Sequence, residues 1–144
     1  MANSDTICLL KECDSGSKMA VSSINEILEK VKDMKLKKIL TESREHHEKL
    51  GNEIHSLLNE YNSETQEPTP IAKSMSWLKT NMKMKMDESD ATAADLITDG
   101  CNMGIKSLYH YLNQYKTAAS EAQDLCKRLI SIEEKLETAL QGYL

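Results

Sequence analysis

Residues 99–108 read DGCNMGIKSL and carry two glycines four positions apart, inside a stretch whose apolar residues have helical spacing. Each glycine in the interior of a helix costs about 0.5–1 kcal/mol relative to alanine. Small residues four positions apart lie on one face of a helix and allow the backbones of two helices to approach closely. We therefore expect Gly100 and Gly104 to be retained because they face another helix.

An earlier part of the chain repeats this pattern. A shift of 84 positions pairs Met103 with Met19, Gly100 with Gly16, Gly104 with Ala20, Ile105 with Val21, Leu108 with Ile24 and Leu112 with Leu28. Because amphipathicity does not require the matched glycine, we interpret the match as an internal duplication rather than as chance similarity. A pseudo-two-fold axis would then bring the two helices together at their small residues. The alternatives are glycines that bend each helix, face solvent or form a homodimer contact.

Four long stretches show apolar residues at steps of three and four, which is typical of bundle helices. These apolar seams cover residues 7–31, 36–57, 94–115 and 122–140. Asp33 is placed to cap the second helix, and either Asp87 or Ser89 is placed to cap the helix of residues 94–115. Ser120 with Gln123 matches a capping box that either begins the last helix or lies in its first turn.

The expected fold is an all-α, ferritin-like four-helix bundle that forms a single domain over residues 1–144. Two repeated hairpins, residues 4–62 and 89–142, are joined by a crossover of residues 63–88. After a polar segment with both prolines, an apolar stripe predicts a short helix in the crossover: Ile71, Met75, Leu78, Met82 and Met86. We expect this helix to pack on the bundle, with Trp77, Met82 and Met86 as a possible partner surface.

Four polar residues lie within the apolar seams and are expected to be buried: Asp14, Ser17, Ser43 and His47. A buried polar group is costly unless it is hydrogen-bonded. We therefore expect His47 to be a hydrogen-bonded core histidine that faces the region of Ser17 to Val21. The alternative is a partial metal site that combines His47 with Glu42, Glu45 or His46, although such neighbouring ligands bind weakly without a fixed geometry.

Composition and motifs narrow the classes of function. The net charge of −5 and the aromatic content of 4% argue against nucleic-acid binding. No phosphate-binding glycine loop, GxSxG or HExxH motif is present, and we expect no catalytic residue, cofactor or metal. The chain shows no signal peptide and no apolar run long enough to span a bilayer. We expect a cytoplasmic protein whose four cysteines are reduced thiols.

Three segments carry a family resemblance: SGSKMAVSSINEIL (residues 15–28), VKDMKLKKIL (31–40) and ATAADLITDGCNMGIKSLYHYL (91–112). They resemble uncharacterised bacterial ferritin-like four-helix-bundle proteins, which are domains of unknown function. The resemblance implies a four-helix bundle and no established reaction. The di-iron site of ferritin-like proteins needs a Glu-x-x-His motif on two helices, and this chain lacks it. Ser43 and Arg44 stand three residues before His46 and His47, and the last helix has no histidine.

From these features we expect a non-enzymatic helical bundle that acts through protein–protein contact or self-association, with a homodimer as the expected state. The alternative is a ferritin-like metal-binding protein with a degenerate or atypical Glu/His site in the helix of residues 36–57.

Overall fold

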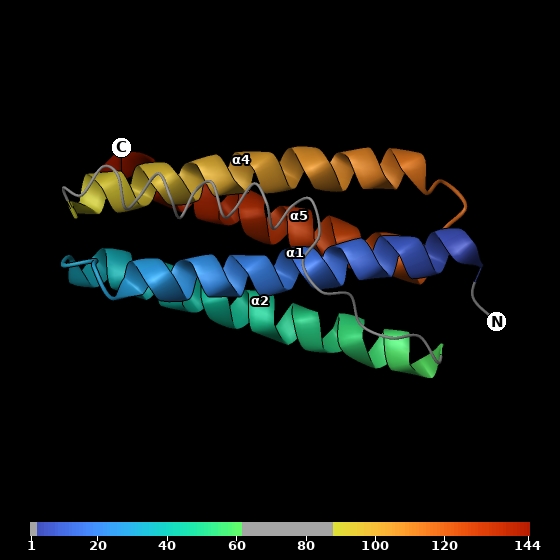
Figure 1. Ribbon diagram of the computed structural model, residues 1–144. Helices are drawn as coiled ribbons and strands as arrows, with labels where there is room; N and C mark the ends of the chain where they lie inside the picture. Colours follow the sequence, from blue (N-terminus) through green and yellow to red (C-terminus); the bar gives the residue numbers. More distant parts are fainter. Residues whose placement is uncertain (1–2, 62–87) are drawn as a thin grey trace.

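The computed structural model describes residues 3–61 and 88–144, and these residues form four long helices and no strand (Figure 1). The elements are α1 (Ser4–Leu28), α2 (Met34–Glu60), α4 (Asp90–Gln114), α5 (Ser120–Leu140) and a short 3-10 turn, η1 (Gln141–Tyr143). The all-α prediction is confirmed for this part of the chain. The expected helix of residues 71–86 and the partner surface of Trp77, Met82 and Met86 lie outside the described residues.

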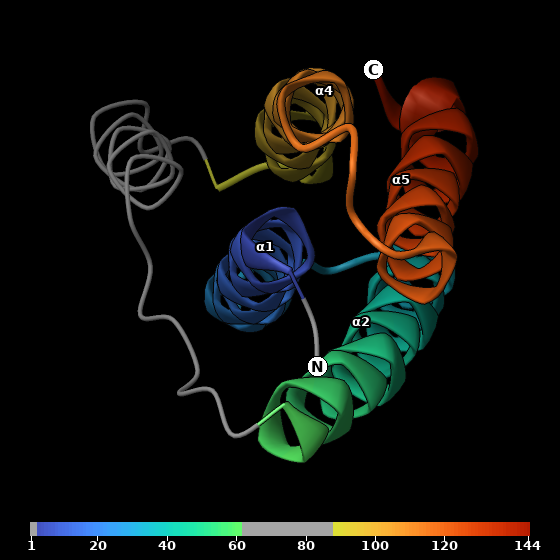
Figure 2. The same cartoon turned by 90° about the vertical axis from the view of Figure 1, so that its right-hand side faces the viewer.

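The four helices pack as a bundle in which α1 and α2 run antiparallel, as do α4 and α5 (Figure 1). Viewed along the bundle (Figure 2), α1 contacts α2, α4 and α5, and α5 also contacts α2 and α4. The contacts α1–α2, α2–α5, α5–α4 and α4–α1 form a ring of neighbours. The contact between α1 and α5, which run in the same direction, therefore crosses a diagonal of the bundle. The last residue of α2 and the first residue of α4 lie at opposite ends of the molecule.

Two apolar clusters fill the interior, one towards each end. The first includes Leu9, Leu10, Leu50, Ile54, Leu58, Cys126, Leu129 and Ile130. The second includes Ile24, Leu36, Leu40, Leu96, Leu136 and Leu140. Each fully buried aliphatic side chain stabilises the fold by about 1.5–3 kcal/mol relative to an exposed one, so these clusters account for the association of the four helices.

Buried polar residues occupy the level between the two clusters. Asp14, Ser15 and Ser17 of α1, Ser43 and His47 of α2, and Glu133 of α5 are all buried. On each of these helices they lie between residues of the first cluster and residues of the second. We call this set of six residues the polar layer.

Side chains cap three of the helix N-termini, and one of them also connects two distant parts of the chain. Asn3 accepts a hydrogen bond from the Thr6 N–H at 2.8 Å and donates to the Thr117 carbonyl at 2.7 Å, which ties the start of α1 to the α4–α5 loop. At the other end of the bundle, Asp33 caps α2 by accepting from the Leu36 N–H at 2.9 Å. Ser89 caps α4 by accepting from the Thr92 N–H. The predicted cap at Asp33 and the alternative at Ser89 are confirmed.

The capping box predicted at Ser120 is wrong. The N-cap position belongs to Ala119, which has no capping side chain; its N–H donates to the Thr6 hydroxyl of α1 at 2.8 Å. The Gln123 amide instead donates to the Ala118 carbonyl at 2.8 Å. The backbone N–H of Gln123, which the motif was expected to satisfy, donates to the Ala119 carbonyl at 3.1 Å, so no side-chain cap is used there.

A close glycine contact joins α1 and α2. A Cβ added at Gly51 would lie 3.0 Å from Ser17 Oγ, closer than ordinary packing permits. That hydroxyl is buried and donates to the Asp14 carbonyl at 3.0 Å, so it cannot move away without losing its hydrogen bond. A Cβ at Gly16, by contrast, would meet only Leu129 Cδ2 at 3.9 Å.

We predict opposite outcomes for alanine at these two helical glycines. Gly16→Ala should stabilise the protein by about 0.5–1 kcal/mol, since the helix loses less backbone entropy and the new methyl group finds room. Gly51→Ala should gain clearly less stability, because its new methyl group would crowd the Ser17 hydroxyl. Urea unfolding followed by circular dichroism measures both. An equal gain in both variants would contradict the close contact, and Ser17→Ala combined with Gly51→Ala should recover the missing stability.

Candidate functional site

A buried histidine–carboxylate pair joins α2 to α5 at the centre of the polar layer. His47 is 0% exposed and Glu133 is 8% exposed. His47 Nε2 lies 2.8 Å from Glu133 Oε1, and His47 Nδ1 lies 2.8 Å from the carbonyl oxygen of Ser43, one turn earlier in α2. Both ring nitrogens are therefore engaged in hydrogen bonds.

The geometry determines where the protons lie. A carbonyl oxygen can only accept, so the Nδ1 of His47 must carry a proton and donate it to Ser43. One further proton lies between Nε2 and Glu133 Oε1, held by the imidazolium or by the carboxylic acid. In either arrangement the pair has no net charge, which reduces the cost of its burial.

Opposing effects act on the pKa of His47. Burial lowers this pKa, but the hydrogen bond and charge of Glu133, together with the Ser43 carbonyl, raise it by more, so that it lies above its ordinary value. The charged imidazolium is therefore favoured as long as Glu133 stays in place.

Cys101 of α4 adds a third group to this site. Burial, followed by the negative charge of Glu133 and a hydrogen bond with it, raises the pKa of the Cys101 thiol far above its ordinary range. The thiol remains protonated and unreactive, because the thiolate is the nucleophilic form. Glu133 thus receives neighbours from both α2 and α4.

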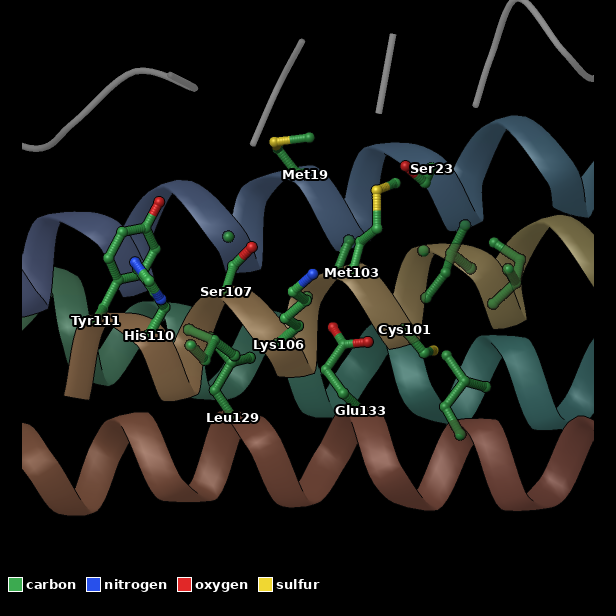
Figure 3. Close-up of a pocket in the computed structure, with 18 residues that line it drawn as sticks. Met19, Ser23, Cys101, Met103, Lys106, Ser107, His110, Tyr111, Leu129 and Glu133 are labelled. Atoms are coloured by element: carbon green, nitrogen blue, oxygen red, sulfur yellow. The ribbon is translucent and has the colours of Figure 1, made fainter. Parts of the chain in front are cut away.

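A groove of about 410 Å³ opens beside this pair, between α1, α4 and α5. Its apolar lining includes Met19, Ile24, Ile97, Met103, Leu129 and Leu136. Figure 3 shows Met19 and Met103 on one side and Glu133 pointing from α5 towards α4. Lys106 and His110, which are both exposed, also border the groove. Glu133 is therefore shared by the protein interior and the groove.

The four small residues singled out from the sequence all line this groove: Gly16, Ala20, Gly100 and Gly104. A Cβ at Gly104 would lie 3.7 Å from Glu133 Cδ, and the Cβ at Gly16 would approach Leu129; both neighbours belong to α5. These two glycines therefore leave space above side chains of α5. The helices α1 and α4 do contact each other, and the predicted role of the small residues in that contact stays a prediction.

The structure places the four predicted buried polar residues, Asp14, Ser17, Ser43 and His47, inside the bundle. It gives His47 a partner on α5, whereas the sequence suggested the Ser17 to Val21 region of α1. Glu42, Glu45 and His46 are exposed, so they do not join His47 in a common site. Within residues 3–61 and 88–144, no three His, Cys, Asp or Glu side chains are placed to hold a metal ion.

Glu133 is the site residue that sequence reasoning missed. The apolar seam of the last helix was assigned through Ile132, which is only half-buried, while Glu133 is buried. Both positions fit between Leu129 and Leu136 at steps of three and four, and the apolar residue was preferred. A buried His47 without a predicted acidic partner was the signal that could have led to Glu133.

Comparison with known proteins gives a fold and no family. No protein-family model matches the chain, and no curated protein matches it. The crystal structure of a DUF305 fragment from Deinococcus radiodurans is similar, with a TM-score of 0.75 and 10% sequence identity; the match covers 98% of this chain and 95% of that chain. At this identity the likeness shows a shared all-helical fold alone. No helix in the described ranges is long and apolar enough to cross a membrane.

The histidine–carboxylate pair predicts that the free energy of unfolding changes with pH, and that the direction of the change depends on Glu133. Since the pKa of His47 is raised above about 6.5, its contribution to the free energy of unfolding is present below that pH and is lost as the pH rises through the raised pKa. In Glu133→Gln, burial remains while the charge is removed, so the pKa should fall and stability should be lost on acidification instead. Urea unfolding at several pH values gives the slope of the free energy of unfolding against pH for the unaltered protein and for Glu133→Gln.

Glu134→Gln is the matched control because Glu134 is the next residue on α5 and is exposed. It should keep the slope of the unaltered protein. The same slope in Glu133→Gln would show that the pair does not govern this pH dependence.

Proposed function

We propose that this protein is a non-enzymatic binding protein whose groove between α1, α4 and α5 holds a small, mainly apolar molecule. The observation that carries the proposal is the groove itself. Its volume of about 410 Å³ lies within the range of about 300–1,000 Å³ that is usual for ligand sites, and such sites combine apolar walls with a few polar groups.

The groups at the groove favour binding over catalysis. His47 has both nitrogens engaged in hydrogen bonds at 2.8 Å, which leaves it without a free nitrogen to act as a base. Burial and the nearby Glu133 keep the pKa of Cys101 raised, so its thiol is a poor nucleophile. The groove keeps its apolar walls and the Glu133 carboxylate, while the Lys106 and His110 side chains at its border are exposed to solvent.

We also propose a ferritin-like bundle built from two repeated hairpins and located in the cytoplasm. The hairpin pairing and the placement of the α2 and α4 ends at opposite ends of the bundle support the architecture, because a long crossover is a feature of ferritin-like folds. The duplication is supported by residues that the shift of 84 positions pairs. Met19 with Met103 and Gly16 with Gly100 line the same groove.

Self-association is a second candidate, favoured by one observation. The residues of the Gly-x-x-x-Gly pattern line a groove that the helices of residues 3–61 and 88–144 leave unfilled, and a second copy of the chain is the partner that we propose for this face. Elsewhere in the described ranges, the large apolar side chains that are exposed are Met34, Tyr109 and Leu144.

We predict that N-phenyl-1-naphthylamine, a neutral apolar dye, binds this protein with a saturable rise in fluorescence because the apolar walls of the groove would replace water around the dye. Ala20→Leu should weaken the binding at least about tenfold, since the added carbons occupy the groove. Ala139→Leu, on the exposed face of α5, makes the same change outside the groove and should bind as the unaltered protein does. Equal binding by both variants would show that the dye does not use the groove.

For self-association, sedimentation velocity of the unaltered chain should show a homodimer. Filling the groove in Ala20→Leu should shift the chain to the monomer, because the new side chain would obstruct the partner, while Ala139→Leu should remain dimeric. A monomer at every concentration of the unaltered chain would eliminate this candidate and leave the ligand-binding proposal intact.

A further inference from the structure

Resting on the proposed groove function, we propose that the ligand is a neutral amphiphile, such as a long-chain alcohol, whose hydroxyl donates a hydrogen bond to the carboxylate of Glu133. Its apolar chain would lie along the walls of the groove. The proposal specifies the chemistry of the ligand and identifies Glu133 as the residue that selects it.

The carboxylate is accessible from the groove because Gly104 has no side chain. A Cβ at this position would stand 3.7 Å from Glu133 Cδ and 3.9 Å from each carboxylate oxygen, so the hydrogen of glycine leaves the space above both oxygens open. Gly104 of α4 and Glu133 of α5 both line the groove, and Figure 3 shows the Glu133 side chain pointing from α5 towards α4.

Glu133 also retains unused acceptor capacity. A carboxylate offers about four lone-pair directions. His47 uses one at 2.8 Å, and the thiol of Cys101 is a second neighbour. The remaining directions can accept a donor from a molecule in the groove, and hydrogen bonds to charged acceptors are roughly twice as strong as neutral ones.

Charge balance selects a neutral head group. The His47–Glu133 pair already has no net charge, so an ammonium group would add an uncompensated positive charge to an apolar site. It could restore neutrality only by expelling the proton between His47 and Glu133, which would leave two lone pairs facing each other at 2.8 Å. A carboxylate head group would be repelled by Glu133. A hydroxyl avoids both costs.

Two other ionisable side chains, Lys106 and His110, border the groove, and both are exposed. Glu137 is half-buried one turn beyond Glu133 on α5. A ligand carboxylate could pair with Lys106 only where water screens the interaction, which is a weaker contact than a hydrogen bond to Glu133 in the interior.

The experiment compares octan-1-ol, octylammonium and octanoate as probes of the full chain. The methionine methyl groups are labelled with carbon-13, and the NMR signals of Met19 and Met103 are followed during each titration, because both side chains line the groove. We expect octan-1-ol to shift both signals saturably and to bind at least about tenfold more tightly than either charged probe.

Two variants test the role of Glu133. Glu133→Gln should bind octan-1-ol more weakly and octanoate more tightly, so that the preference for octan-1-ol over octanoate becomes smaller. Gly104→Ala should also reduce the preference, because its methyl group covers the carboxylate. Gly16→Ala is the matched control: it adds a methyl group to the same groove beside Leu129 and should keep the preference.

The experiment separates a failure of the proposed groove function from a failure of the proposed selection by Glu133. If none of the three probes shifts the Met19 and Met103 signals, the groove does not bind apolar ligands and the proposed function itself is wrong. If the probes bind with equal affinity, or if a charged probe binds most tightly, the groove function stands and the selection by Glu133 is overturned. An unchanged preference in both Glu133→Gln and Gly104→Ala would overturn it as well.

Discussion

The hydrogen bond between His47 and Glu133 is the interaction on which the middle of this bundle depends. It spans 2.8 Å between α2 and α5 with both side chains buried, and each group would be costly to bury without the other. An apolar seam alone lets one helix slide or rotate against another at modest cost. A buried polar pair is satisfied only when its two groups meet, so it favours the register of α2 against α5 that brings His47 to Glu133, as isolated polar residues do in coiled coils.

The same pair connects the buried polar layer to the groove on the surface of the bundle. Glu133 belongs to the polar layer between two apolar clusters, and it also lines the groove between α1, α4 and α5. Gly16 and Gly104 keep the groove open over α5, whereas Gly51 permits the close approach of α2 to Ser17 of α1. Helical glycines thus serve two purposes here: Gly51 allows close packing, whereas Gly16 and Gly104 leave space above α5.

The likeness to the DUF305 fragment, at 10% identity over nearly the whole of both chains, illustrates how few sequence features a helical bundle requires. Steps of three and four between aliphatic residues are sufficient to associate the helices. The chemistry of a site resides in the few side chains that depart from this pattern. In this chain they are the members of the polar layer and the small residues of the groove.

The sequence by itself determined what depends on a single helix. The seam of α2, from Leu36 through Ser43 and His47 to Leu57, is buried as its spacing predicts, and the caps at Asp33 and Ser89 follow from local hydrogen bonding. Only the tertiary structure decided which groups meet. Glu133 rather than Ile132 faces His47, Ala119 rather than Ser120 is the N-cap of α5 and donates to the Thr6 hydroxyl, and Gly16 and Gly104 face side chains of α5. The reason is geometric: spacing defines a face of one helix, whereas a contact depends also on the rotation and axial position of the helix opposite.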